Sequence, residues 1–141
     1  MSDLSEKPLN WKPDPTIGYT VVRRADGGMN FTFTDASMRT LEHWRDFSEE
    51  HLLDSDRLTC NLYDLRQIKE LPYEAIQIAL QLSADPSTRN IRMAVVIANE
   101  DVRKGIQQIV DLTAPLGLEM GIFTDIAEAE AWLNRPLTMK T

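Results

Sequence analysis

Few side chains in this sequence could take part in catalysis or metal binding. Cys60 is the only cysteine, and His43 and His51 are the only histidines. A cysteine nucleophile needs a histidine and an acid that converge on its sulfur, whereas Cys60 alternates with Leu58 and Leu62 and is expected in the core. The two histidines are eight residues apart on one expected helix, too far for a shared metal ion. We therefore predict no catalytic group, no metal site and no cofactor.

Polar residues follow the expected strands, at the edge of the sheet where ligands of open α/β folds usually bind. One interpretation is a polar rim that grips a ligand or a divalent ion, with the candidates Asp64, Arg66, Asn99, Thr124 and Asp125. The alternative is that Asp35, Asn99 and Asp125 cap the helices that follow them. Asp64 has no such explanation, because no helix is expected directly after it.

The hydrophobic pattern predicts the elements that position these residues. Residues 17–33 are expected to form a hairpin, because apolar residues alternate on both sides of a turn at Gly27 and Gly28. The continuous apolar run from Met93 to Ala98 is typical of a strand covered on both faces. Further strands are expected over 58–63 and 118–123, and helices over 35–52, 72–84, 99–114 and 125–135.

The resulting order is β-β-α-β-α-β-α-β-α, which predicts an α/β domain with a mixed five-stranded sheet. Strand–helix–strand connections are right-handed crossovers that join parallel strands, so the sheet should be mostly parallel. We expect one domain over 17–136, an extended lead-in over 1–16 and a short tail over 137–141.

Composition narrows the classes of partner and the cellular compartment. The chain has 141 residues and a formal net charge of −7, which argues against nucleic acid because phosphate binding needs clustered Lys and Arg. No segment approaches the ~20 apolar residues of a membrane span. A single cysteine and a polar start without a signal-peptide pattern favour the cytoplasm.

Three segments carry a resemblance to a known family. They are Leu62-Tyr63-Asp64-Leu65-Arg66, the apolar run from Met93 to Ala98, and Phe123-Thr124-Asp125 with the helix that closes in Ala131-Trp132-Leu133. In these segments the chain resembles the SpoIIAA-like branch of the STAS superfamily, which is itself similar to the lipid-carrying CRAL-TRIO domain. The resemblance implies a SpoIIAA-like fold and a regulatory or ligand-holding function.

The same resemblance implies a phosphorylation switch that this chain lacks. In the anti-sigma antagonists of the family, a strand ending in Asp-Leu leads to a serine just before a helix. Here Asp64-Leu65 leads to Pro72-Tyr73, and no serine or threonine occurs from Leu65 to Leu82. The switch therefore does not carry over to this sequence.

The helix expected over 72–84 is unusually apolar for a surface helix. At 100° per residue, one apolar stripe contains Leu71, Ala75, Ile78, Ala79 and Leu82. A second stripe, made of Tyr73, Ile76 and Leu80, lies beside it, whereas one stripe normally suffices. Either the helix is buried between its neighbours, or the second stripe binds a subunit or a ligand.

Two functions remain open at this point. The preferred hypothesis is a non-enzymatic STAS-like module that acts through protein contacts, as a homodimer that uses Tyr73, Ile76 and Leu80. The alternative is a carrier or sensor of an apolar, lipid-like molecule held between helices and sheet. An apolar cavity of several hundred Å³ would favour the carrier, and a flat exposed stripe on helix 72–84 would favour the interaction module.

Overall fold

The computed structural model describes residues 14–51, 59–86, 88 and 91–135. Most of the expected lead-in, all of the expected tail and Leu58 lie outside these residues. Within the described part of the chain, no helix is both long and apolar enough to cross a membrane.

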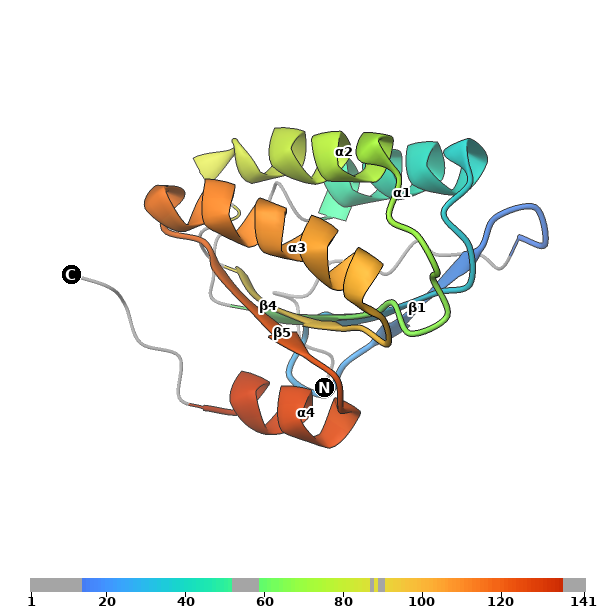
Figure 1. Ribbon diagram of the computed structural model, residues 1–141. Helices are drawn as coiled ribbons and strands as arrows, with labels where there is room; N and C mark the ends of the chain where they lie inside the picture. Colours follow the sequence, from blue (N-terminus) through green and yellow to red (C-terminus); the bar gives the residue numbers. More distant parts are fainter. Residues whose placement is uncertain (1–13, 52–58, 87, 89–90, 136–141) are drawn as a thin grey trace.

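Five strands form a single sheet in sequential order, β1-β2-β3-β4-β5 (Figure 1). The first pair is antiparallel and the other three pairs are parallel, which confirms the predicted mixed sheet. The strands are β1 (Tyr19–Arg23), β2 (Met29–Phe33), β3 (Thr59–Asp64), β4 (Ile91–Val96) and β5 (Glu119–Phe123).

The helices cover the two faces of the sheet unequally. Three helices lie on one face and a shorter one lies on the other (Figure 1). The three are α1 (Met38–His51), α2 (Tyr73–Ser83) and α3 (Glu100–Thr113), and the fourth is α4 (Ile126–Leu133). A short 3₁₀ turn, η2 (Ala114–Leu116), ends at Gly117, whose φ of 88° is in the left-handed region that favours glycine.

Aromatic side chains form the larger core, between the sheet and the three helices. Phe31 and Tyr63 stack on neighbouring strands with ring centroids 4.6 Å apart. From α1, Phe47 meets Phe31 edge-on, and Trp44 meets Tyr63 in the same way. These contacts fix α1 over β2 and β3. The side chains that the strand and helix patterns place inward therefore pack in one core.

Strand β4 is buried at all six positions, as its apolar run predicts. Its alternate residues Ala94 and Val96 belong to a second, smaller core on the other face. Ala129 and Leu133 of α4 close this core, and both are almost fully buried. The short final helix thus buries a narrow apolar stripe.

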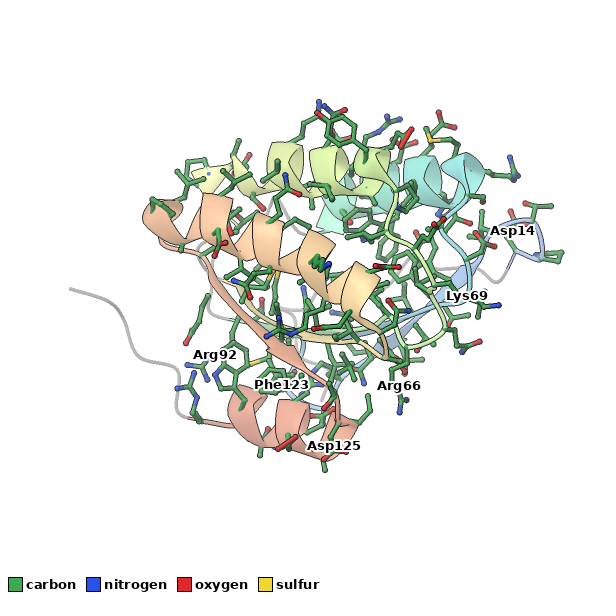
Figure 2. All side chains as sticks on the ribbon, viewed as in Figure 1. Asp14, Arg66, Lys69, Arg92, Phe123 and Asp125 are labelled. Atoms are coloured by element: carbon green, nitrogen blue, oxygen red, sulfur yellow. The ribbon has the colours of Figure 1, made fainter. Side chains whose placement is uncertain are left out.

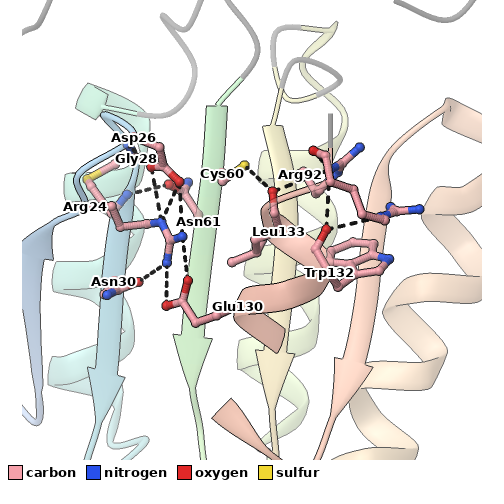
Figure 3. Close-up of polar contacts among 12 residues, drawn as sticks. Arg24, Asp26, Gly28, Asn30, Cys60, Asn61, Arg92, Glu130, Trp132 and Leu133 are labelled. Carbon is pink, nitrogen blue, oxygen red and sulfur yellow. Dashed lines mark hydrogen bonds and ion pairs between the residues drawn. The ribbon is translucent and has the colours of Figure 1, made fainter. Parts of the chain in front are cut away.

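Two buried arginines join α4 to the sheet (Figure 3). Arg24, in the hairpin turn, donates to both carboxylate oxygens of Glu130 on α4 at 2.9 and 2.8 Å. Arg92, on β4, donates to Glu119 at 2.9 Å and to the carbonyl of Arg135 at 2.8 Å. Sequence reasoning missed both arginines, because the ion pair of Arg24 spans 106 residues and has no local pattern.

Candidate functional site

Asp64 has a structural explanation that its sequence position did not supply. Its carboxylate accepts hydrogen bonds from the Arg66 side chain at 3.0 and 2.9 Å and from the Arg66 amide at 3.1 Å. These bonds lower the pKa of Asp64 below its usual value. The pair therefore closes the turn by which the chain leaves β3.

Asn99 is the cap of α3, as the helix-cap interpretation predicts. Its Oδ1 accepts a hydrogen bond from the Val102 amide at 2.9 Å. Its Nδ2 donates to the carbonyl of Ile68 at 3.0 Å and ties α3 to the loop before α2. Both ends of the amide are thus engaged within the protein.

Two other expected caps are wrong. Asp125 is at the N-cap position of α4, but its side chain makes no capping hydrogen bond. Asp35 precedes α1 by three residues, and its carboxylate accepts from the Ser37 amide at 3.0 Å and the Thr40 hydroxyl at 2.7 Å. Asp35 shapes the turn before the helix, so α1 begins at Met38 and not at residue 35.

The polar rim is only partly assembled. Asp64 and Arg66 lie together, and Arg66 is close enough to Asp125 to sense its charge (Figure 2). Thr124 is exposed beside them, whereas Asn99 is engaged elsewhere. In the described ranges, no three His, Cys, Asp or Glu side chains are placed to hold a metal ion.

Helix α2 buries part of the second apolar stripe, which was made of Tyr73, Ile76 and Leu80, as well as the first. Ile76 is only 7% exposed and belongs to the larger core, so the prediction that it lies on the surface is wrong. The reason is its neighbour α3, which covers this side of α2: Leu71 packs closely on Gly105, and Ile76 lies beside the same glycine. Leu80 is half-buried against the same core, and Tyr73 is 65% exposed.

The solvent face of α2 carries a different stripe from the one predicted. Tyr73, Gln77 and Gln81 are all exposed and follow one another at intervals of four residues, so they lie along one side of the helix. We call these three residues the α2 stripe. The Gln77 amide donates to the Tyr73 hydroxyl at 3.0 Å, which joins the first two members.

An apolar cavity of about 100 Å³ lies between the sheet and helices α1, α2 and α3. Side chains from all of these elements line it, among them Trp44, Tyr63, Ala79, Met93 and Ile106. This volume is well below the several hundred Å³ expected of a lipid carrier.

Cys60 lies in the smaller core, as predicted. The side chain is 4% exposed, and its thiol donates to the carbonyl of Leu133 at 3.4 Å. Burial raises the pKa of the thiol, which disfavours the reactive thiolate.

We therefore expect Cys60 to resist alkylation in the native protein. Iodoacetamide should label it only in denaturant, as read by intact mass. Cys60→Ala should cost about 1 kcal/mol of stability, the value of a small buried group. Rapid labelling without denaturant would contradict this placement.

His43 and Trp132 both have partners within the protein. The ring of His43 meets the Tyr19 hydroxyl through Nδ1 at 2.8 Å. Trp132 is half-buried at the edge of the smaller core, whereas Ala129 and Leu133 of α4 point into that core. The indole packs on Phe123 and under the guanidinium groups of Arg92 and Arg135. It therefore seals the edge of the smaller core.

The fold of this chain is similar to that of several solved structures. No family model matches the chain, and no curated protein does. An anti-sigma factor antagonist from Mycobacterium paratuberculosis superposes with a TM-score of 0.64 at 15% identity, covering 86% of this chain and 98% of that one.

Two further solved structures agree. A protein of the DUF3478 family from Shewanella loihica, described as having a SpoIIAA-like fold, has a TM-score of 0.60 at 17% identity, with 87% of this chain and 99% of that one covered. A proposed anti-sigma factor antagonist from Thermotoga maritima has a TM-score of 0.57 at 14% identity, with coverage of 86% and 97%. Such identities bear on the fold alone, and the chain therefore has a SpoIIAA-like fold.

Proposed function

We propose that the chain is a non-enzymatic interaction module whose partner, a second copy of itself, docks on the α2 stripe. The observation that carries the proposal is an exposed, uncharged row of side chains, Tyr73, Gln77 and Gln81, along one side of a helix. Within the ranges that the structure describes, Tyr73 has the largest exposed fraction of the large hydrophobic side chains, at 65%.

The distribution of charge around α2 supports this use. Glu74 is the only charged residue of the helix. The neighbouring helices expose charged side chains, such as Glu42 on α1 and Arg103 and Lys104 on α3. Protein interfaces have the same arrangement, with a core poor in charge and rich in tyrosine and a polar rim around it.

The chemistry of the stripe favours a second copy as the partner. A glutamine amide both donates and accepts hydrogen bonds, so it can pair with the same residue of another molecule. A twofold axis places identical patches face to face, which is the commonest way for one chain to cover its own surface. With Gln77 at the centre of the row, the axis would pass beside this residue. Leu80 is rotated by about 60° from Gln77. It adds half-buried apolar area on the Tyr73 side of the row.

Two features support a role without catalysis. The chemically capable side chains Cys60 and His43 are engaged in packing or with other protein groups. Proteins described as anti-sigma factor antagonists share the fold, and that description implies protein partners.

The absence of serine and threonine from Leu65 to Leu82 separates this chain from a serine-based switch at the start of α2. A lipid-carrying role finds less support, because the cavity holds only about 100 Å³.

The exchange Gln77→Glu tests the proposal. It would place two carboxylates together at the axis, and charges about 4 Å apart repel by roughly 1–4 kcal/mol in partly hydrated surroundings. We expect the dimer dissociation constant in sedimentation velocity to rise about tenfold or more.

The matched control is Gln108→Glu, the same exchange at an exposed position of α3. It should leave the dissociation constant unchanged. A wild-type protein that stays monomeric at high micromolar concentration, or an equal effect of both exchanges, would refute the proposal.

A further inference from the structure

The two edges of the sheet differ in how well the larger core is covered. At the β1 edge, the side chains that face this core, Tyr19 and Val21, are 2% and 5% exposed. At the β5 edge, the corresponding side chains, Met120 and Ile122, are only half-buried. On the other face of β5, Phe123 is half-buried against the smaller core. Both cores are therefore left partly open along β5.

The backbone of β5 also has donors and acceptors that point out of the sheet. The carbonyl of Phe123 is directed towards β4, where it accepts from the Ile97 amide at 2.9 Å. Successive residues of a strand direct their N–H and C=O groups to opposite sides, so those of Met120 and Ile122 point away from β4. In the described sheet β5 is the last strand, and Figure 1 shows it at the front with α3 above it and α4 below it.

The sequence of β5 does little to prevent pairing with another strand. Natural edge strands usually carry charges, proline or a bulge that blocks such pairing. From Met120 to Phe123 the strand has neither charge nor proline. Its one charged residue, Glu119, is at the first position and is already paired with Arg92 and Arg135. The edge is therefore an open template for one more strand.

The position of α3 decides between a second copy and a separate segment as the occupant. This helix lies close above β5 (Figure 1). Two copies paired through β5 would place these strands about 4.8 Å apart, and each α3 would lie above its own strand. Packed helices need roughly 8–10 Å between their axes, so the two α3 helices would collide. A segment that carries no helix above it meets no such obstacle.

We propose that β5 binds an extended segment of another protein, which adds to the sheet beside β5. An extended polypeptide matches the regular spacing of the outward N–H and C=O groups, and main-chain hydrogen bonds give such complexes their affinity. Alternate side chains of the segment are apolar where they meet Met120 and Ile122. On the other face they meet the ring of Phe123, on which Trp132 packs. This surface is separate from the α2 stripe, so its failure would leave the proposed dimer unaffected.

Hydrogen exchange of the full chain tests first whether the edge is open. The amides of Met120 and Ile122 should exchange at least about tenfold faster than those of Gly121 and Phe123, which point to β4. Protection of Met120 and Ile122 in dilute protein would show that another part of the chain or a second copy already covers the edge. That result would overturn the proposal.

The probe for binding is the heptapeptide acetyl-Lys-Val-Thr-Val-Thr-Val-Lys-amide, which alternates apolar and polar residues. In ¹H–¹⁵N spectra of the full chain, it should move the amide protons of Met120 and Ile122 downfield as they form hydrogen bonds. The matched control peptide is N-methylated at every valine and threonine, which keeps the side chains but removes the donors. It should bind at least about tenfold more weakly.

Met120→Lys places a charge on the edge and should weaken binding of the heptapeptide about tenfold or more. Val22→Lys, at an exposed position of β1 on the opposite edge, should bind the peptide as the wild type does. Equal binding of the two peptides, or no shift at Met120 and Ile122 with millimolar heptapeptide, would contradict the proposal. The wild-type spectra decide the matter even if Met120→Lys does not fold.

Discussion

The exchange Gly28→Ala is expected to destabilise the domain by at least about 3 kcal/mol, at the upper end of the cost of overpacking. A Cβ atom at Gly28 would overlap with the carbonyl oxygen of Cys60 on the neighbouring strand β3. Backbone cannot rotate away as a side chain can, so β2 and β3 would have to separate where they pair in parallel. Urea denaturation of the purified variant measures the loss, which is large against a typical total of about 5–15 kcal/mol.

Gly105→Ala is the matched control for this prediction. There the new Cβ would meet the end of the flexible Leu71 side chain at 2.8 Å, which can move. Alanine also gains about 1 kcal/mol over glycine inside a helix, so the net change should stay within about 1 kcal/mol of zero. Equal stability of the two variants would show that the hairpin does not lie against β3 as described.

The exchange Arg92→Met should cost about 3–5 kcal/mol, the range seen when one partner of a buried ion pair is removed. The Arg92 side chain is 6% exposed and donates both to Glu119 and to the carbonyls that end α4, at Trp132, Leu133 and Arg135. Methionine fills a similar volume but leaves these acceptors without their donor. Hydrogen exchange should show that α4 loses protection first.

Arg135→Met is the control, because it removes a second guanidinium from the same carboxylate. This side chain is 49% exposed, and an exposed pair contributes about 0–1 kcal/mol. Similar losses from the two variants would contradict the buried role assigned to Arg92.

Acidification should narrow the difference in stability between Arg92→Met and the wild type. Burial raises the pKa of Glu119, but hydrogen bonds and charge from Arg92, and then from Arg135, outweigh burial, so the net pKa is lowered. A lowered pKa means that the pair stabilises the fold above the carboxylate's unfolded pKa and loses that effect as the pH falls. Arg92→Met should therefore lose less stability on acidification than the wild type does.

The sheet could be predicted from sequence because its signals are local. The alternation over residues 17–33 and the run from Met93 to Ala98 each lie in one short segment, and both elements form as expected. The order of elements then sets the strand directions.

The surface of α2 could not be predicted in the same way. Helical periodicity assigns Ile76 to a second stripe, but whether that stripe meets water depends on α3, which is about 30 residues away in the chain. Ile76 packs beside Gly105 of α3, and nothing near position 76 signals this contact. Tyr73 faces solvent as expected, with 65% of its side chain exposed.

Of the polar residues that follow the strands, some could be predicted from local sequence and others could not. Asn99 could be read as a cap because capping needs only its own helix. Asp125 occupies the equivalent position, yet its side chain makes no cap. Long-range contacts from Arg24 and Arg92 hold α4 instead, and such pairs have no sequence spacing to detect.

Disulfide trapping of Gln77→Cys tests most directly whether the chain pairs through α2. Native Cys60 is buried, so the new thiol is the accessible one, and a twofold axis beside residue 77 would bring two copies of it together. Under mild oxidation at low micromolar concentration, the account predicts a covalent dimer of Gln77→Cys on a non-reducing gel. Glu128→Cys, at an exposed position of α4 on the opposite face of the sheet, should stay monomeric. If Gln77→Cys stays monomeric, or cross-links no faster than Glu128→Cys, the α2 stripe is not the interface.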